Sequence, residues 1–390
     1  MLFNLFHLMP YRHLKASDIE GYDSSALVLP NRFFDPELGS ALYNEYLDQL
    51  EYAEEIGFDG VCINEHHQTA YGIMPSPNVI AAMLARRTEH IKIGILGNAI
   101  AVRDNPLRVA EEVAMLDSVT RGRIISGFVR GIGWEYYAQQ INPTESRARF
   151  EEAHDLIVKS WTEEGPFEWH SPHYHYRYVN GWPRPYQQPH PPIWVPGTGS
   201  TETMKWVAEH RYNYMSVFAP AAIIKTWFDK FRQAADAAGY EPAPEQLGWL
   251  IPIFIGETHE KAVADAREHL DWLYRVGLRL RSEYFYPPGY LTSNSLRGIL
   301  SSGAKPFAEI SYEELIEKRY VVVGSEESVT EQLGRLQDEL GFGNLLALLQ
   351  IGSMGPERTR ENMDRFATGV MPHFKRSSSS VHSDVAAEAV

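Results

Sequence analysis

The chain has 390 residues, 44% hydrophobic and 12% aromatic, which is enough for a substantial core in two domains or in one large α/β barrel. Its formal net charge of −15 leaves no surplus of Lys and Arg for a nucleic-acid partner, and its one cysteine, Cys62, excludes an internal disulfide and fits a reducing compartment. No apolar run approaches the ~20 residues of a membrane helix, so we expect a cytoplasmic protein with no membrane partner.

Short β-rich runs alternate with helical stretches from the first residues onward. The apolar run at 2–9 predicts a buried first strand, and 41–58 has apolar residues at helical spacing, with Gly57 ending the helix. The same alternation predicts further strands at 60–64, 91–102, 123–129, 192–197, 213–218, 248–256 and 344–352. Further helices are predicted at 76–88, 105–120, 145–164, 201–211, 221–239, 258–280, 328–342 and 358–374.

Two segments interrupt this alternation. Residues 165–192 are rich in Pro, His and aromatic residues and predict an excursion such as a hairpin, and 281–318 predict a second insertion. Eight strands that are apolar on both faces and alternate with helices predict a (β/α)₈ TIM barrel, with the insertions at the carboxyl ends of the strands. We expect a single domain over 1–376 and a disordered tail over 377–390, which has too little apolar content to pack.

A doubly wound sheet is the alternative to the barrel. Such a sheet would more naturally carry a glycine-rich turn directly after its first strand, and here that turn reads MPYRHLK. The barrel is therefore the favoured fold.

Two adjacent histidines, His66 and His67, follow the second predicted strand, and barrel chemistry gathers at such carboxyl ends. Imidazole exchanges protons near neutral pH, so an acid–base role is one interpretation and ordinary loop polarity is another. A metal site is disfavoured, because HxxxH spacing is absent and adjacent side chains in an extended segment point to opposite faces. His173 and His175 could add ligands, but no carboxylate follows them at diagnostic spacing. We expect no metal at the site.

Two further strand ends suggest a site for a phosphate group. Arg130 follows the fourth strand, and the sequence GTGSTET at 197–203 places hydroxyl groups and free backbone N–H groups at a helix start. Either feature alone is weak evidence, since Arg130 could be a surface cation and the loop could simply cap a helix. Together they favour a phosphorylated cofactor.

The stretches at 57–132 and 192–210 resemble the bacterial luciferase-like flavin monooxygenases, and the resemblance extends to residue 374. It implies reduced FMN supplied by a separate flavin reductase, O₂ added to it as a flavin hydroperoxide, and oxygenation of a small organic substrate. It also implies a homodimer formed through helices early in the barrel. Luciferases carry a reactive cysteine where this chain has Val129, so light emission is not implied.

The resemblance also assigns roles to residues. His66 falls on the catalytic histidine, which would hydrogen-bond the oxygen adduct and control its proton. Cofactor binding is implied for a larger group, in which Gly97 and Asn98 fall near a non-prolyl cis peptide under the flavin ring and Glu65 positions its loop or contacts the flavin edge. The group is Glu65, Gly97, Asn98, Arg130, Gly131, Ile132, Gly199, Ser200 and Thr203. Aromatic residues that could wall a substrate pocket are Phe6, Trp134 and Trp194.

Other functions remain open at this point. A deazaflavin-dependent oxidoreductase uses the same barrel for hydride transfer, and some relatives bind flavin without turnover. A metal-dependent barrel hydrolase is a third class. The substrate is predicted only as a small organic molecule, and the aromatic residues at 281–290 do not specify it.

Overall fold

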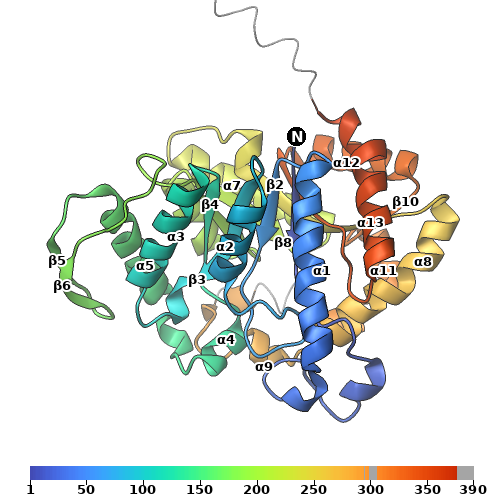
Figure 1. The fold of residues 1–390 in the computed structure, drawn as a ribbon, viewed down its shortest axis with the longest axis horizontal. Coiled ribbons are helices and arrows are strands. Elements are labelled where there is room, and N and C mark those ends of the chain that lie inside the picture. The colour runs from blue at the N-terminus through green and yellow to red at the C-terminus, as the bar shows by residue number, and fades with distance from the viewer. Residues whose placement is uncertain (294, 298–304, 376–390) are drawn as a thin grey trace, which may run out of the picture.

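Eight parallel strands close into a barrel, as predicted (Figure 1). They pair in the order β11, β1, β2, β3, β4, β7, β8 and β9, and β9 pairs with β11 to complete the circle. The strands are β1 (Leu2–His7), β2 (Gly60–Ile63), β3 (Lys92–Ala99), β4 (Ile124–Val129), β7 (Ile193–Gly197), β8 (Asn213–Val217), β9 (Leu247–Ile255) and β11 (Asn344–Leu348). The structure, a computed structural model, describes residues 1–293, 295–297 and 305–375. The predicted disordered tail at 377–390 lies outside the described residues.

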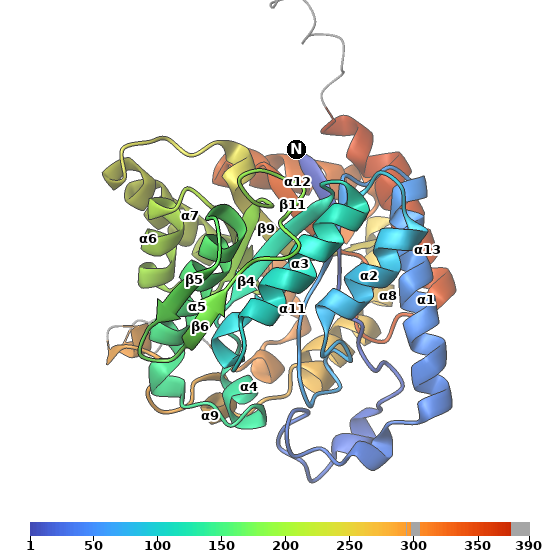
Figure 2. The same cartoon turned by 60° about the vertical axis from the view of Figure 1, so that its left-hand side comes forward.

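Helices cover the outer face of the barrel, as Figures 1 and 2 show. The helices of the described residues, including α4, α9 and α11 near the carboxyl ends of the strands, are α1 (Pro36–Glu55), α2 (Pro77–Arg87), α3 (Leu107–Thr120), α4 (Gly133–Ala138), α5 (Ser146–Thr162), α6 (Thr201–Glu209), α7 (Ala221–Ala237), α8 (His259–Asp271), α9 (Ser282–Phe285), α11 (Tyr312–Glu317), α12 (Glu326–Leu340) and α13 (Pro356–Arg365). Among the described residues, no helix is long and apolar enough to cross a membrane.

The first helix begins earlier than predicted. The prediction placed its start at residue 41, whereas α1 begins at Pro36. One carboxylate oxygen of Asp35 accepts hydrogen bonds from the N–H groups of Glu37 and Leu38, and proline suits the first turn. The capping signal therefore lies outside the apolar periodicity on which the prediction rested.

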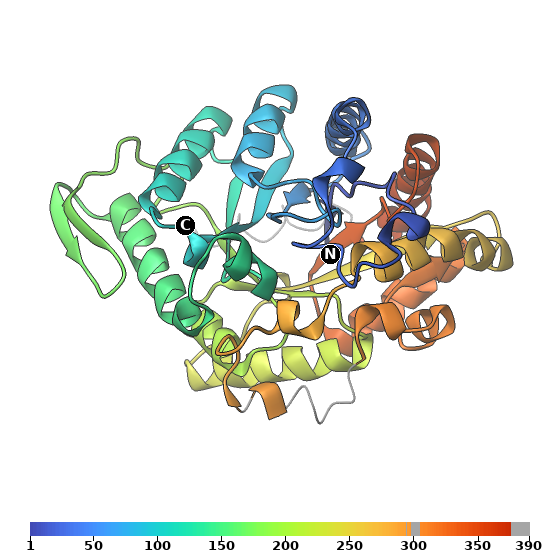
Figure 3. The ribbon, with the colours of Figure 1, turned by 90° about the horizontal axis from the view of Figure 1, so that it is seen from below.

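The segment at 165–192 contains a hairpin, as predicted. Strands β5 (Phe167–His170) and β6 (His175–Val179) pair antiparallel, and Figure 3 shows them projecting from the side of the barrel. The hairpin is inserted between α5 and β7. Its turn lies along α5, because His173 contacts both Glu145, directly before that helix, and Glu152, two turns further on.

The second insertion crosses the carboxyl ends of the strands. It carries α9 and α11, and α9 lies beside α4 at the lower edge of Figure 1. The chain then forms a short strand that was not predicted, β10 (Val322–Gly324), which pairs with the last three residues of β9. Residues 294 and 298–304 of this insertion lie outside the described part.

Buried apolar side chains form two layers, one inside the barrel and one between the barrel and its helices. Cys62 lies in the inner layer, and burial raises the pKa of its thiol, which fits the expected role as a small apolar residue. Gly248 on β9 also faces a crowded interior. A Cβ atom at this position would lie 2.0 Å from the Met215 sulfur, so a large residue on one strand requires glycine on the next.

Candidate active site

His66 lies just beyond the carboxyl end of β2, buried among aromatic side chains. It is 8% exposed, and its ring centroid is 5.0 Å from that of Tyr71 and 5.4 Å from that of Trp134. Its Nδ1 lies 3.1 Å from Oε1 of Glu135. Within the described part of the chain, Nε2 has no hydrogen-bond partner, so this nitrogen is left to interact with a ligand.

Glu135 on α4 joins His66 to the loop after β4. Its second carboxylate oxygen accepts a hydrogen bond from the N–H of Ile132 at 2.8 Å, and the side chain is almost fully buried. Gly131 permits this approach, because it has a φ of +87° and a Cβ there would lie 2.9 Å from Glu135 Oε2. A single carboxylate therefore orients both the imidazole and the loop that carries Arg130.

The side chain of Glu65 is fully buried, and both of its oxygens have partners. Oε1 lies 2.7 Å from Nε2 of His67, and Oε2 accepts hydrogen bonds from Arg103 at 2.6 Å and from the N–H of Ala99 at 3.1 Å. These contacts tie the loop after β2 to the loop after β3. Two roles were expected for Glu65, positioning its loop or contacting the flavin edge, and these contacts favour the first.

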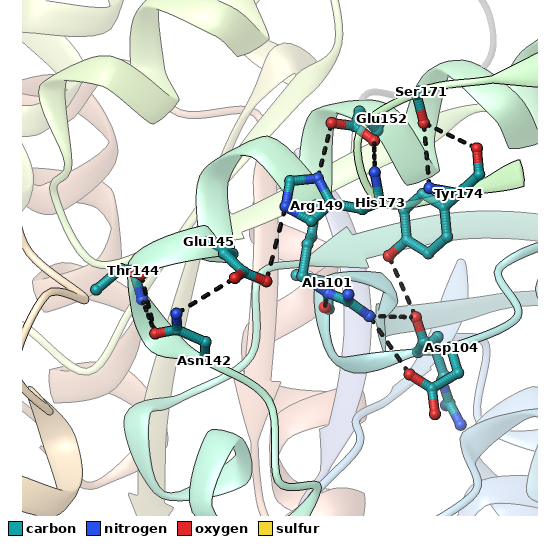
Figure 4. Close-up of polar contacts among 11 residues, drawn as sticks. Ala101, Asp104, Asn142, Thr144, Glu145, Arg149, Glu152, Ser171, His173 and Tyr174 are labelled. Atoms are coloured by element: carbon teal, nitrogen blue, oxygen red, sulfur yellow. Dashed lines mark hydrogen bonds and ion pairs between the residues drawn. The ribbon is translucent and has the colours of Figure 1, made fainter.

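Side chains of α5 and of the hairpin hold the loop that carries Arg103, and Figure 4 shows their hydrogen bonds. Arg149 on α5 donates hydrogen bonds to the carbonyl oxygens of Ala101 and Arg103, at 2.8 Å and 2.9 Å. Tyr174 donates to the Arg103 carbonyl oxygen at 3.2 Å, and His173 lies between Glu145 and Glu152. The hairpin is thus connected, through Arg103, to Glu65.

Arg130 follows β4, as predicted, and is held between α5 and the second insertion. Its guanidinium donates to the Ser146 hydroxyl at 3.2 Å and lies over the ring of Tyr290, 4.4 Å from the centroid. Tyr290 in turn donates to the carbonyl oxygen of Gly131 at 2.7 Å. The second insertion therefore packs directly on the loop after β4.

Arg147 brings a second guanidinium to the same place and contacts two of the predicted residues. It donates to the hydroxyls of Ser200 and Thr203, each at 3.3 Å. Ser200 caps α6 by accepting from the Thr203 N–H, and it donates to Glu202 at 3.0 Å. Burial and the neighbouring Arg130 lower the pKa of Arg147 from its ordinary value. An anion between the two guanidiniums would relieve this repulsion.

Gly199 precedes this cap and must be a glycine. Its φ is +90°, and a Cβ at this position would lie 2.2 Å from the Trp227 ring. Its N–H donates to the Tyr214 hydroxyl at 3.2 Å. The turn into α6 therefore depends on a glycine here.

Gly97 and Asn98 lie at the carboxyl end of β3. A non-prolyl cis peptide bond joins Leu96 to Gly97, one bond before the Gly97–Asn98 bond. Asn98 is fully buried, and neither atom of its amide has a partner among the described residues. The hydroxyls of Ser126 on β4 and Ser216 on β8 are likewise buried without a partner. Burying polar groups without hydrogen-bond partners lowers stability, so these groups suit a polar ligand that binds at the carboxyl end of the barrel.

The three aromatic residues expected at a substrate pocket belong to one buried apolar cluster, which includes the interior of the barrel. Trp134 is fully buried and donates to the carbonyl oxygen of His67 at 3.0 Å. Phe6 is the fifth residue of β1, near the carboxyl end of that strand. Trp194 is only the second residue of β7, so it lies deeper, toward the opposite end of the barrel.

Comparison with known proteins identifies the family. The sequence model of the luciferase-like monooxygenases matches residues 25–342. The chain belongs to this family. It is 24% identical over 360 residues to the oxygenase component of the flavin-dependent trigonelline monooxygenase of Acinetobacter baylyi, which covers 90% of this chain and 96% of that protein.

Two of the solved structures that share the fold of this chain illustrate its relatives. The oxygenating constituent of 3,6-diketocamphane monooxygenase from Pseudomonas putida, a type II Baeyer–Villiger enzyme in complex with FMN, has a TM-score of 0.71, 18% identity and coverage of 97% and 100%. An F420-dependent secondary alcohol dehydrogenase has a TM-score of 0.66, 17% identity and coverage of 86% and 96%. At these identities the likeness concerns the fold alone.

Glu135 and Arg147 contact the predicted site residues but were not themselves predicted from the sequence. Glu135 stands three residues after Ile132 and accepts a hydrogen bond from its N–H, but Ile132 offers no side-chain acceptor, so the sequence carries no full capping pattern that would have indicated α4. Arg147 stands at the start of α5, a helix that also begins at the carboxyl face of the barrel. Its position there could have indicated a second cation near Arg130.

His7, the last residue of β1, predicts a pH dependence of stability. Burial lowers its pKa from 6.5 to about 4, while Nε2 contacts Gln49 at 2.9 Å. The pKa of His7 is lower in the folded protein than in the unfolded chain, so the contribution of its neutral imidazole to the free energy of unfolding is complete above about pH 6.5. This contribution is lost as the pH falls toward 4, by about 3 kcal/mol in total. Urea unfolding between pH 7 and 4 should show a smaller loss in His7→Gln than in wild type. Identical pH profiles would contradict this.

Proposed function

We propose that this chain is the oxygenase component of a two-component monooxygenase that uses reduced FMN from a flavin reductase, and O₂, to oxygenate a small organic substrate. The observation that carries the proposal is the pair of guanidiniums, Arg130 and Arg147, beside two hydroxyls at the start of α6. A helix start with such partners suits a phosphate group. His66 lies at the carboxyl end of the same barrel and supplies an acid–base group.

The residues present fit the FMN cofactor. Arg130, Arg147, Ser200 and Thr203 would hold its phosphate, with the N–H groups at the start of α6. Asn98, whose amide has no partner among the described residues, would meet the polar edge of the ring system. Reduced FMN, when bound, supplies the electrons that activate O₂ for transfer of one oxygen atom.

His66 would hold or move a proton through Nε2 during this reaction. Glu135 fixes the orientation of its ring through Nδ1. Aromatic side chains extend from this imidazole, because Trp134 packs on Phe285 at 6.0 Å and Phe285 packs on Phe307 at 5.8 Å. An apolar surround of this kind would exclude water from an oxygen reaction.

Titration with two reduced cofactors tests this proposal against its nearest alternative. The shared fold with an F420-dependent enzyme makes a deazaflavin-dependent oxidoreductase the second candidate. We expect reduced FMN to bind about tenfold or more tightly than a reduced deazaflavin, as measured anaerobically by tryptophan fluorescence.

Turnover should then depend on a flavin reductase and O₂. Mass spectrometry of a small substrate panel should show a product that has gained one oxygen atom. Tighter binding of the deazaflavin would favour the oxidoreductase. Tight FMN binding without reductase-dependent O₂ consumption across the panel would favour a flavin-binding protein without turnover.

We also propose a homodimer formed through α2 and α3. Four large apolar residues are about half exposed on these neighbouring helices: Val79 and Met83 on α2, and Met115 and Val119 on α3. Each pair has i, i+4 spacing and therefore shares a helix face. Light scattering should find dimers for wild type and monomers for Met83→Glu. The control Leu38→Glu on α1, where Leu38 is 40% exposed, should remain dimeric. Monomeric wild type would contradict the proposal.

A further inference from the structure

Helices α5 and α6 meet at three successive places that begin at the phosphate-binding residues. Arg147 contacts Thr203 at 3.3 Å, and one turn further the ring centroids of Phe150 and Trp206 are 5.1 Å apart. Two turns from the start, the ring centroids of His154 and His210 are again 5.1 Å apart. Because residues i, i+3 and i+7 share a helix face, the two helices lie side by side along this line.

The third meeting place contains three side chains that could bind a metal ion. Among the described residues, one group of His, Cys, Asp or Glu has suitable spacing: His154, Asp155 and His210. One ligand atom from each lies within 4.8 Å of the others. Ligand atoms around one Zn²⁺ are at most about 4.2 Å apart, twice a typical bond length. Asp155 and His210 are exposed, so their side chains can close this small difference by rotation.

The hydrogen bonds of the two histidines favour this role. Nδ1 of His210 contacts the carbonyl oxygen of Trp206 at 2.8 Å, which places its proton there and leaves the Nε2 lone pair free. Nε2 of His154 lies 3.0 Å from the Tyr212 hydroxyl, while its Nδ1 faces Asp155 at 2.8 Å. Metal-binding histidines commonly engage their second nitrogen with a protein oxygen in this way.

The donor atoms of this group indicate which metals it suits. Two imidazole nitrogens and one carboxylate oxygen suit Zn²⁺ or Ni²⁺ and not Mg²⁺, which prefers oxygen ligands.

We propose that His154, Asp155 and His210 bind one divalent transition-metal ion, with water completing its coordination, and that the ion joins α5 to α6. This site lies outside the barrel, two helical turns from the phosphate-binding residues, and it stands independently of the cofactor and the reaction. Its effect is to fasten together the two helices that carry Arg147 and Thr203.

Zinc binding to the untagged full chain, freed of metal with EDTA and dialysed, tests the site. Atomic absorption after equilibrium dialysis should find one more bound Zn²⁺ in wild type than in His210→Ala. Zn²⁺ should raise the thermal midpoint of wild type and have a smaller effect on the variant, whereas Mg²⁺ should have no effect on either. Asp155→Asn should weaken zinc binding about tenfold or more.

The matched control is His90→Ala, because His90 is also exposed but lies on the loop before β3, away from this group. This variant should keep the wild-type zinc stoichiometry. Equal stoichiometry in wild type and His210→Ala, with both variants folded by circular dichroism, would overturn the proposal. A loss in His90→Ala equal to that in His210→Ala would also overturn it.

Discussion

Replacement of His66 with alanine should lower product formation by about 10²- to 10⁴-fold while FMN binding stays close to that of wild type. The range is that of a positioned acid–base group, and His66 makes no contact with the residues proposed to bind the phosphate. The electrons taken up from the reductase should then appear as hydrogen peroxide. The measurement is the ratio of product to peroxide per reductant consumed.

Two companion variants make this experiment specific. Glu135→Gln keeps a side-chain acceptor for the Ile132 N–H but removes the negative charge beside His66, so product yield should fall while FMN affinity is retained. His67→Ala should have a smaller effect than His66→Ala, because the His67 imidazole is engaged with Glu65. An unchanged product-to-peroxide ratio in His66→Ala would remove His66 from the mechanism.

Replacement of Arg147 with alanine should weaken FMN binding by about 10- to 100-fold. Hydrogen bonds to charged groups contribute about 1.5–3 kcal/mol, which corresponds to this range of affinity. Riboflavin lacks the phosphate, so its binding should change little. Parallel titrations of the two ligands, followed by fluorescence, measure the difference.

The control for this variant is Lys205→Ala. Lys205 is a cation on the same helix as Thr203, but its side chain is 71% exposed and contacts Glu209. It should bind both ligands as wild type does. Equal weakening of FMN and riboflavin in Arg147→Ala would show that Arg147 acts on the fold and not on a phosphate group.

The sequence predicted the barrel well, because each strand is a short run of residues that is apolar on both faces. The eight predicted strands are those of the barrel, with boundaries within a few residues. Helix starts were less certain where capping residues stand apart from the apolar periodicity, as at Asp35. β10 was missed because three residues are too few to show a pattern, and its pairing with β9 is a long-range contact.

The site residues divide into those that the predicted strands place and those that only tertiary packing places. Arg130 stands directly after one predicted strand, and Ser200 and Thr203 stand at the start of the helix that follows another, so the barrel alone places all three at one end. Arg147 and Glu135 stand at helix starts whose positions depend on the packing of α4 and α5. No local signal states that the Glu135 carboxylate faces His66, which is 69 residues away in the chain. Such partnerships arise from tertiary structure.

The carboxylate of Glu135 couples two parts of the site that act on different atoms. One oxygen orients His66, and the other holds the backbone of Ile132, two residues after Arg130. A shift of this short segment would therefore move Arg130, the proposed phosphate ligand, together with the partner of the imidazole. If the proposed function holds, cofactor occupancy and proton transfer are linked over a single turn of the chain. Mutations that change cofactor affinity through this segment should then also lower the yield of product per reductant consumed.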